Sequence, residues 1–153
     1  MGRLMSRDEF NLVRFLDAQE HIYARALEEL RAGKKRSHWI WYVFPQLKGL
    51  GRSVVAQTYG ITGTNEARAY LAHPVLGARL KESIEAIESQ HSDNATSVLG
   101  ELDALKFRSC LTLFSCAAPS EEVFKHAIDR FFSGNLDAAT LALITNITGE
   151  YRE

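Results

Sequence analysis

Apolar residues recur at helical spacing along most of this chain, and this periodicity is the strongest constraint on its fold. In residues 10–30 the apolar residues that recur at this spacing are Phe10, Val13, Leu16, Ile22, Ala26, Leu27 and Leu30. In residues 75–87 they are Val75, Leu76, Leu80, Ile84 and Ile87. Spacings of three and four residues put such side chains on one face of a helix. The pattern therefore predicts an all-α fold.

Capping residues divide the chain into separate helices. Ser6 and Glu9 form a capping box before the first apolar stretch, with a possible break near residues 17–19, and Gly33 is typical of the position just after a helix. His73-Pro74 marks a further start, because proline fits the first helical turn. The segment from Trp39 to Phe44 fits either a strand or a short buried helix.

Loop and capping residues also mark the helix boundaries in the second half of the chain. Residues 92–94 (Ser-Asp-Asn) form a loop, and Asp103 is expected to cap a helix that is apolar on most sides and therefore central. Pro119-Ser120 begins another helix, which Gly134-Asn135 ends, and Asp137 begins the last one. No internal repeat or linker is present. We expect one compact multihelical domain over residues 1–153, with its core at about 7–147.

The composition fits a packed protein without a membrane segment. Hydrophobic residues make up 46% of the chain and charged residues 24%, which argues against disorder. No apolar stretch precedes Asp8, and no run approaches the roughly 18 apolar residues of a membrane span. Cys110 and Cys116 are too far apart on one helix for a disulfide, so we expect two buried thiols. These features predict a cytoplasmic protein, which we expect to be a monomer.

The charge is unevenly distributed. The net charge is −1, yet no Asp or Glu occurs between Glu29 and Glu66. Six cations lie in that interval, and the rest of the chain carries a balance of −7. The six are Arg31, Lys34, Lys35, Arg36, Lys48 and Arg52. A basic segment in an acidic chain indicates a local attraction for anions.

Two strings within and after the basic segment carry a family resemblance. They are SHWIWYVFPQL (residues 37–47) and YLAHPVLG (residues 70–77), accompanied by Leu50-Gly51, Tyr59-Gly60-Ile61 and Thr112-Leu113-Phe114. With them the chain resembles, over nearly its whole length, the bacterial family known as domain of unknown function 1810. The resemblance implies a multihelical single domain and no particular activity. Where the family tends to show two adjacent serines, Cys110 replaces the second, which weakens any catalytic role for that hydroxyl.

Some members of that family carry the label calpastatin. Calpastatins are disordered inhibitory repeats, whereas this composition is that of a packed globule. We therefore do not expect calpain inhibition.

The basic segment also combines cations with aromatic rings and a glycine turn. Trp39 and Trp41 offer flat faces for stacking, and Lys35, Arg36 and Arg52 offer positive charge. Gly51 would let backbone amides approach a phosphate where a helix begins. The remaining predicted ligand-binding residues are Gln46, Tyr59 and His73. This set predicts a small anionic ligand, nucleotide-like or ADP-ribose-like; if the protein is an enzyme, His38 and Asp103 are its acid–base candidates.

Other interpretations remain open for the same residues. Trp39 and Trp41 would serve equally as core, Lys34–Arg36 as a solvated helix end, and His73 as a cap. The same surface could instead bind an acidic protein or, less favoured, single-stranded nucleic acid, and the chain could be a structural accessory domain. The five histidines are dispersed and no Cys-x-x-Cys occurs, so we predict no metal site, and we predict no cofactor.

Overall fold

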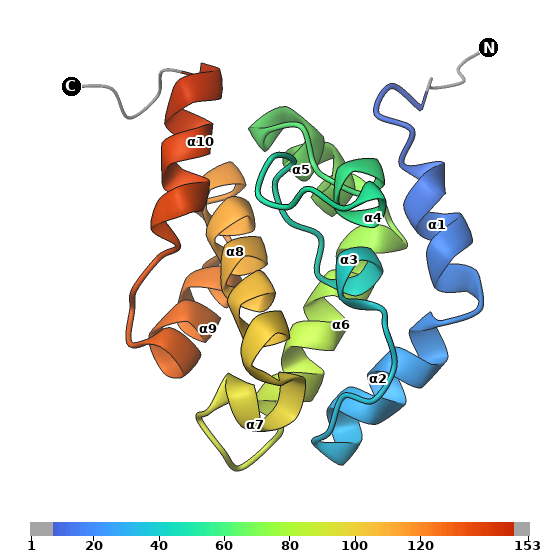
Figure 1. Cartoon of the computed structure of the whole chain (residues 1–153), viewed down its shortest axis with the longest axis vertical. Helices are drawn as coiled ribbons and strands as arrows, with labels where there is room; N and C mark the ends of the chain where they lie inside the picture. Colours follow the sequence, from blue (N-terminus) through green and yellow to red (C-terminus); the bar gives the residue numbers. More distant parts are fainter. Residues whose placement is uncertain (1–7, 149–153) are drawn as a thin grey trace.

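The computed structural model describes residues 8–148, and within that range the chain forms ten helices and no strand (Figure 1). Their bounds are α1 Val13–Glu20, α2 Tyr23–Ala32, α3 Ile40–Val43, α4 Val54–Thr58, α5 Thr64–Ala72, α6 Leu76–Glu88, α7 Ala95–Leu99, α8 Glu101–Ala117, α9 Glu122–Phe132 and α10 Ala138–Thr148. One isolated parallel bridge joins Leu47 to Ile61 and closes the loop that carries α4. The predicted all-α single domain is confirmed.

Helix α8 is the central element of the fold. It packs against α3, α5, α7, α9 and α10, and Figure 1 shows it passing between the neighbouring helices. Nine of its residues are buried, among them Phe107, Leu111 and Phe114. A helix that is apolar on most sides gains free energy only when neighbours cover it all round. The sequence-based prediction of a central helix here is confirmed.

The first helix begins later than the capping pattern predicted. Ser6 lies outside the described residues, and α1 starts at Val13. The carboxylate of Asp8 accepts hydrogen bonds from the amides of Leu12 (2.7 Å) and Val13 (2.9 Å). The break between α1 and α2 falls at residues 21–22, slightly after the predicted position.

The ambiguous segment after the basic residues forms the short helix α3. Trp39 precedes it with a fully buried side chain, and Phe44, also fully buried, ends it. Pro45 disfavours helical dihedral angles at the residue before it, which explains why the helix stops at one turn. Burial of the flanking aromatic rings, rather than helix length, stabilises this segment.

Polar side chains cap several helices. The Nδ1 atom of His73 accepts hydrogen bonds from the amides of Val75 (3.1 Å) and Leu76 (3.2 Å) at the start of α6. Asp137 accepts one from the amide of Thr140 (3.0 Å), as predicted for the last helix. The predicted cap at Asp103 is wrong, because α8 already begins at Glu101 and Gly100 is its N-cap residue.

Neither cysteine forms a disulfide in the described part of the chain, and only one of the two is buried. Cys110 is enclosed in the core, and this burial raises the pKa of its thiol well above the usual value. A thiol that stays protonated is a poor nucleophile, which suits packing rather than chemistry. Cys116 is half-buried, so its predicted full burial is wrong.

Among residues 8–148, no helix combines the length and the apolar character needed to cross a membrane.

Candidate functional site

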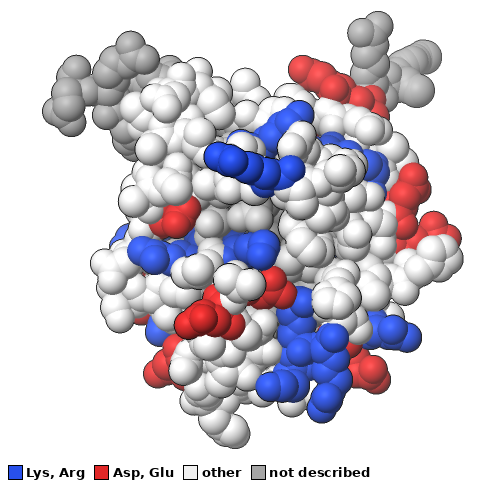
Figure 2. Space-filling model, viewed as in Figure 1, with Lys and Arg blue, Asp and Glu red and all other residues white. Residues whose placement is uncertain are grey.

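The connection between α2 and α3 carries three of the six cations of the basic segment, and we call residues 34–38 the basic connection. Gly33 ends α2 in the left-handed conformation (φ 80°), which glycine adopts at little cost. Along the connection burial alternates: Lys34, Arg36 and His38 are exposed, while Lys35 and Ser37 are turned partly inward. Figure 2 shows basic side chains gathered at the lower right of the molecule, over this part of the fold.

A buried carboxylate holds the basic connection in place. Oε1 of Glu29 accepts hydrogen bonds from the amides of Arg36 (2.9 Å) and Ser37 (3.0 Å). It also accepts one from the indole nitrogen of Trp39 (2.8 Å), and Oε2 accepts the hydroxyl of Ser37 (2.7 Å). The two carboxylate oxygens are thus occupied by donors from the loop and from Trp39, and in residues 8–148 no Lys or Arg side chain forms an ion pair with them. Glu29 therefore orders the loop that carries the cations without forming an ion pair with any of them.

These hydrogen bonds also change the titration of Glu29. Burial alone would raise the pKa of the carboxyl, because it penalises the charged form. The donors from Ser37, Arg36 and Trp39 outweigh it and lower the pKa from 4.5 to about 2. Glu29 is therefore ionised at neutral pH, and its charge is stabilised inside the protein.

Lys35 is the one inward-facing cation of the connection. Its Nζ atom pairs with Oδ2 of Asp103 on α8 at 2.7 Å and lies 4.9 Å from the centroid of the Trp39 ring. Oδ1 of Asp103 lies 3.6 Å from Nζ of Lys106, which confirms the predicted pairing at i, i+3. Nζ of Lys106 is in turn 5.9 Å from the centroid of the half-buried Trp41. A series of charged side chains, Lys35, Asp103 and Lys106, therefore links the basic connection to α8 and to Trp41.

Two open hollows flank the basic connection and share Arg36. The first, of about 390 Å³, is also lined by Arg25, Lys34 and two acids, the exposed Glu28 and the buried Glu29. The second, of about 450 Å³, is lined by Lys35, Arg36, His38, Leu99, Leu102 and Asp103, among others. Within residues 8–148, the side chains of Arg25, Lys34, Arg36 and His38 make no hydrogen bond or ion pair. Unpaired cations beside an open hollow are available to a ligand.

Four of the predicted site residues therefore meet at one place. Lys35, Arg36, His38 and Asp103 all line the second hollow, although no contact joins His38 to Asp103 in the described part of the chain. Trp41 is near this group of residues, because Lys106 contacts both the Trp41 ring and Asp103. Trp39 does not face a ligand, because its side chain is 0% exposed and packs against Phe44. Its large apolar ring is stabilised in the core, the alternative that the sequence had left open.

Other predicted residues belong to the neighbouring loop. Gly51 and Arg52 precede α4. The hydroxyl oxygen of Ser53 caps this helix by accepting a hydrogen bond from the amide of Ala56 (3.1 Å). The side chain of Arg52 is exposed, and Arg52 lines neither of the two hollows. Gln46 is largely buried, and its backbone carbonyl accepts a hydrogen bond from the amide of Ile61 (2.9 Å).

The last two predicted residues have structural surroundings. Tyr59 is half-buried, and its ring packs against Phe15 and Tyr42 with centroids 5.7 and 4.7 Å away. His73 caps α6 through Nδ1, so that nitrogen is already used as an acceptor. Neither lines the hollows beside the basic connection.

Sequence reasoning missed the residues that order the basic segment. Glu29 and Glu66 are the acids at its two borders, and both are buried. Glu66 pairs with Arg14 at 2.8 Å and accepts the amide and hydroxyl of Thr62 at 2.9 Å each. The available signal for Glu29 was its place beside the buried Ala26 and Leu30 on one helix face, where an exposed acid is unexpected.

Comparisons with known proteins agree with this architecture. The sequence profile of the family described as "Protein of unknown function (DUF1810)" matches residues 9–144. The crystal structure of the conserved hypothetical protein Rv1873 from Mycobacterium tuberculosis is similar, with a TM-score of 0.88 and 42% sequence identity. The similarity covers 90% of this chain and 99% of that one. A comparison with curated proteins gave no match. The chain belongs to the DUF1810 family.

Proposed function

We propose that this protein binds a small anionic ligand, a phosphorylated molecule of the nucleotide or sugar-phosphate class, at the basic connection. One observation carries the proposal: Lys34 and Arg36 face solvent without a partner on a loop that a buried acid holds in one conformation. A loop that is ordered before binding loses less conformational entropy when the ligand arrives. Two cations and the nearby Arg25 then supply the charge.

Basic residues outnumber exposed acids at the first hollow, where Arg25, Lys34 and Arg36 share the lining with one exposed acid, Glu28, whereas the second hollow also contains the exposed Glu101. The carboxylate of Glu29 is enclosed by four hydrogen-bond donors, and that of Asp103 pairs with Lys35 and Lys106. These two acids therefore do little to neutralise Arg36, whose planar guanidinium can donate two parallel hydrogen bonds to a phosphate.

His38 is the better supported of the two acid–base candidates. It is exposed on the rim of the second hollow and has no described hydrogen bond, so its imidazole is free to approach a ligand. Both carboxylate oxygens of Asp103 already have partners, the ammonium groups of Lys35 at 2.7 Å and of Lys106 at 3.6 Å, so this side chain is less accessible to a ligand than His38. If a bound ligand is processed, we assign the proton transfer to His38.

A thermal-shift panel tests the proposal. ADP, glucose 6-phosphate and inorganic phosphate, each at about 5 mM, should raise the melting temperature, whereas neutral adenosine should not. The double variant Lys34→Ser/Arg36→Ser should lose the effect. The control Lys48→Ser/Arg52→Ser removes the same charge from exposed positions of the neighbouring loop and should keep it. Equal loss in both double variants, or no stabilisation of the wild type, would refute binding at the basic connection.

One observation favours a second candidate function, the binding of an acidic polypeptide. Leu102 is 70% exposed on the rim of the second hollow, and Leu105 is 54% exposed on the same helix. Exposed leucines beside unpaired cations suit a chain that alternates acidic and apolar residues. Single-stranded nucleic acid gains less support, because the buried Trp39 cannot stack a base. Leu102→Ser should weaken peptide binding and leave phosphate binding unchanged.

A further inference from the structure

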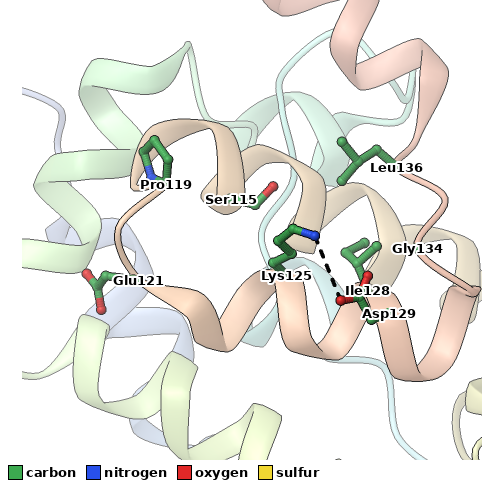
Figure 3. A pocket seen from close by; sticks show the side chains of 8 residues that line it. All are labelled: Ser115, Pro119, Glu121, Lys125, Ile128, Asp129, Gly134 and Leu136. Atoms are coloured by element: carbon green, nitrogen blue, oxygen red, sulfur yellow. Dashed lines mark ion pairs between the residues drawn. The ribbon is translucent and has the colours of Figure 1, made fainter.

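A small pocket lies between the end of α8, the face of α9 that carries Lys125 and Ile128, and the connections before and after α9 (Figure 3). We call it the α9 pocket, and the residues that matter here are Ser115, Pro119, Lys125, Ile128, Asp129 and Leu136. It holds about 170 Å³ and is more enclosed than the two hollows beside the basic connection. It shares no residue with them, so it is a separate candidate site.

Hydrogen bonds fix the wall of the α9 pocket that follows α9. Arg108 donates from Nε to the carbonyl of Asn135 (2.8 Å) and from Nη2 to that of Leu136 (2.9 Å). The preceding turn places Ser133 at a φ of 54°, which is uncommon for a residue other than glycine. Ser133 is the C-cap residue of α9, and helices commonly end with a residue in this left-handed conformation. The pocket is therefore formed before any ligand binds.

The pocket offers two acceptor groups, the Ser115 hydroxyl and the Asp129 carboxylate, beside the ammonium group of Lys125. Ser115 donates its hydroxyl proton to the carbonyl of Thr112 at 3.0 Å, so its lone pairs remain free to accept. The carboxylate of Asp129 has only a loose partner, Nζ of Lys125 at 3.9 Å, and both side chains are largely exposed. Figure 3 shows Ser115, Lys125 and Leu136 around a common space. Glu121 at the far edge pairs with Lys81.

We propose that the α9 pocket binds a small organic amine with an apolar body about the size of a benzene ring. An engineered protein cavity of about 150 Å³ accommodates benzene, so the volume here suits one ring. Ile128, Pro119 and Leu136 supply apolar contact. The ligand's ammonium group replaces that of Lys125 beside Asp129 and donates to the hydroxyl oxygen of Ser115. Ligand and pocket then satisfy each other's polar groups.

A titration followed by amide NMR spectra tests this proposal with three matched ligands. Benzylamine, benzyl alcohol and benzoate share one ring and differ in charge. We expect saturable shifts at the amides of residues 115–136, with a benzylamine dissociation constant on the order of 1 mM. Benzylamine should bind about two- to five-fold more tightly than benzyl alcohol, the range expected of one exposed ion pair. Benzoate should bind most weakly.

Variants assign the effect to named groups. Asp129→Asn should remove the preference for the amine and keep the binding of benzyl alcohol, whereas the control Glu122→Gln, an exposed acid on the same helix, should change neither. Leu136→Trp, at the pocket rim, should block all three ligands. Tighter binding of benzoate than of benzylamine, unchanged binding in Leu136→Trp, or no saturable shift up to about 20 mM would overturn the proposal.

Discussion

The indole nitrogen of Trp39 donates a hydrogen bond of 2.8 Å to the carboxylate of Glu29, and both side chains are buried. This contact joins the end of α2 to the residue before α3, so both ends of the connecting loop, residues 34–38, are held in place. Because Glu29 also accepts two loop amides, the loop has one arrangement, with Lys34 and Arg36 outward. An acid thus positions a basic surface.

Glu29→Gln should lower the free energy of unfolding by about 2 kcal/mol, because a neutral amide replaces the charged acceptor of four hydrogen bonds. Urea denaturation at neutral pH measures the change. Glu28→Gln, an exposed neighbour, is the matched control and should change stability by less than about 0.5 kcal/mol. Similar values for the two variants would contradict the anchoring role of Glu29.

Glu29 should also give the protein a defined acid dependence. Its carboxyl has a pKa of about 2 in the folded protein, against an ordinary value of 4.5. As the pH falls, the unfolded chain takes up the proton first, so the stabilisation is complete above the ordinary pKa and lost through the folded one. The stability difference between wild type and Glu29→Gln should shrink from about pH 5 to about pH 2. A difference that stays constant over this range would exclude this linkage.

The helices were predictable, whereas the contacts that build the site were not. Periodic apolar residues identified α2, α6 and α8, because the pattern reports directly on which face is buried. The pairing of Lys35 with Asp103 joins residues 68 positions apart, and no local pattern specifies it. Asp103 was therefore misread as a cap, since its position near a helix start was the visible signal.

The aromatic residues show the same limit. Trp39 and Trp41 are two positions apart and have similar chemistry, yet one is fully buried and the other half-buried. Their exposure depends on how α3 lies against α8, which composition cannot indicate. Helix α7 was also missed, because five residues are too few to show a period.

Gly77→Ala should destabilise the fold by about 3 kcal/mol or prevent folding, because the added Cβ would lie 2.1 Å from the carbonyl oxygen of Leu71. Gly63→Ala is the comparison, since its backbone is extended and its Cβ would meet Ile147 at an ordinary 3.7 Å. Gly63 is the N-cap residue of α5, where alanine is less favourable than glycine, so we expect this change to cost about 1 kcal/mol. Thermal unfolding of both variants measures the contrast, and equal melting temperatures would show that α5 and α6 are not packed this closely.

His73→Ala should cost about 1 kcal/mol, because the first amides of α6 lose their acceptor. His73→Asn should recover most of this loss, since its side-chain oxygen can cap the same amides. His91→Ala, at an exposed position, is the control and should be neutral. If His73→Asn and His73→Ala are equally unstable, the ring contributes by packing and not by capping.

Amide chemical-shift mapping with ADP tests the central claim most directly, because it locates the ligand as well as detecting it. We predict that the largest saturable shifts fall at residues 34–38 and that Lys34→Ser/Arg36→Ser abolishes them. Shifts centred on residues 51–53 at the start of α4, or no saturable shift in the wild-type protein, would contradict the assignment of the anion site to the basic connection.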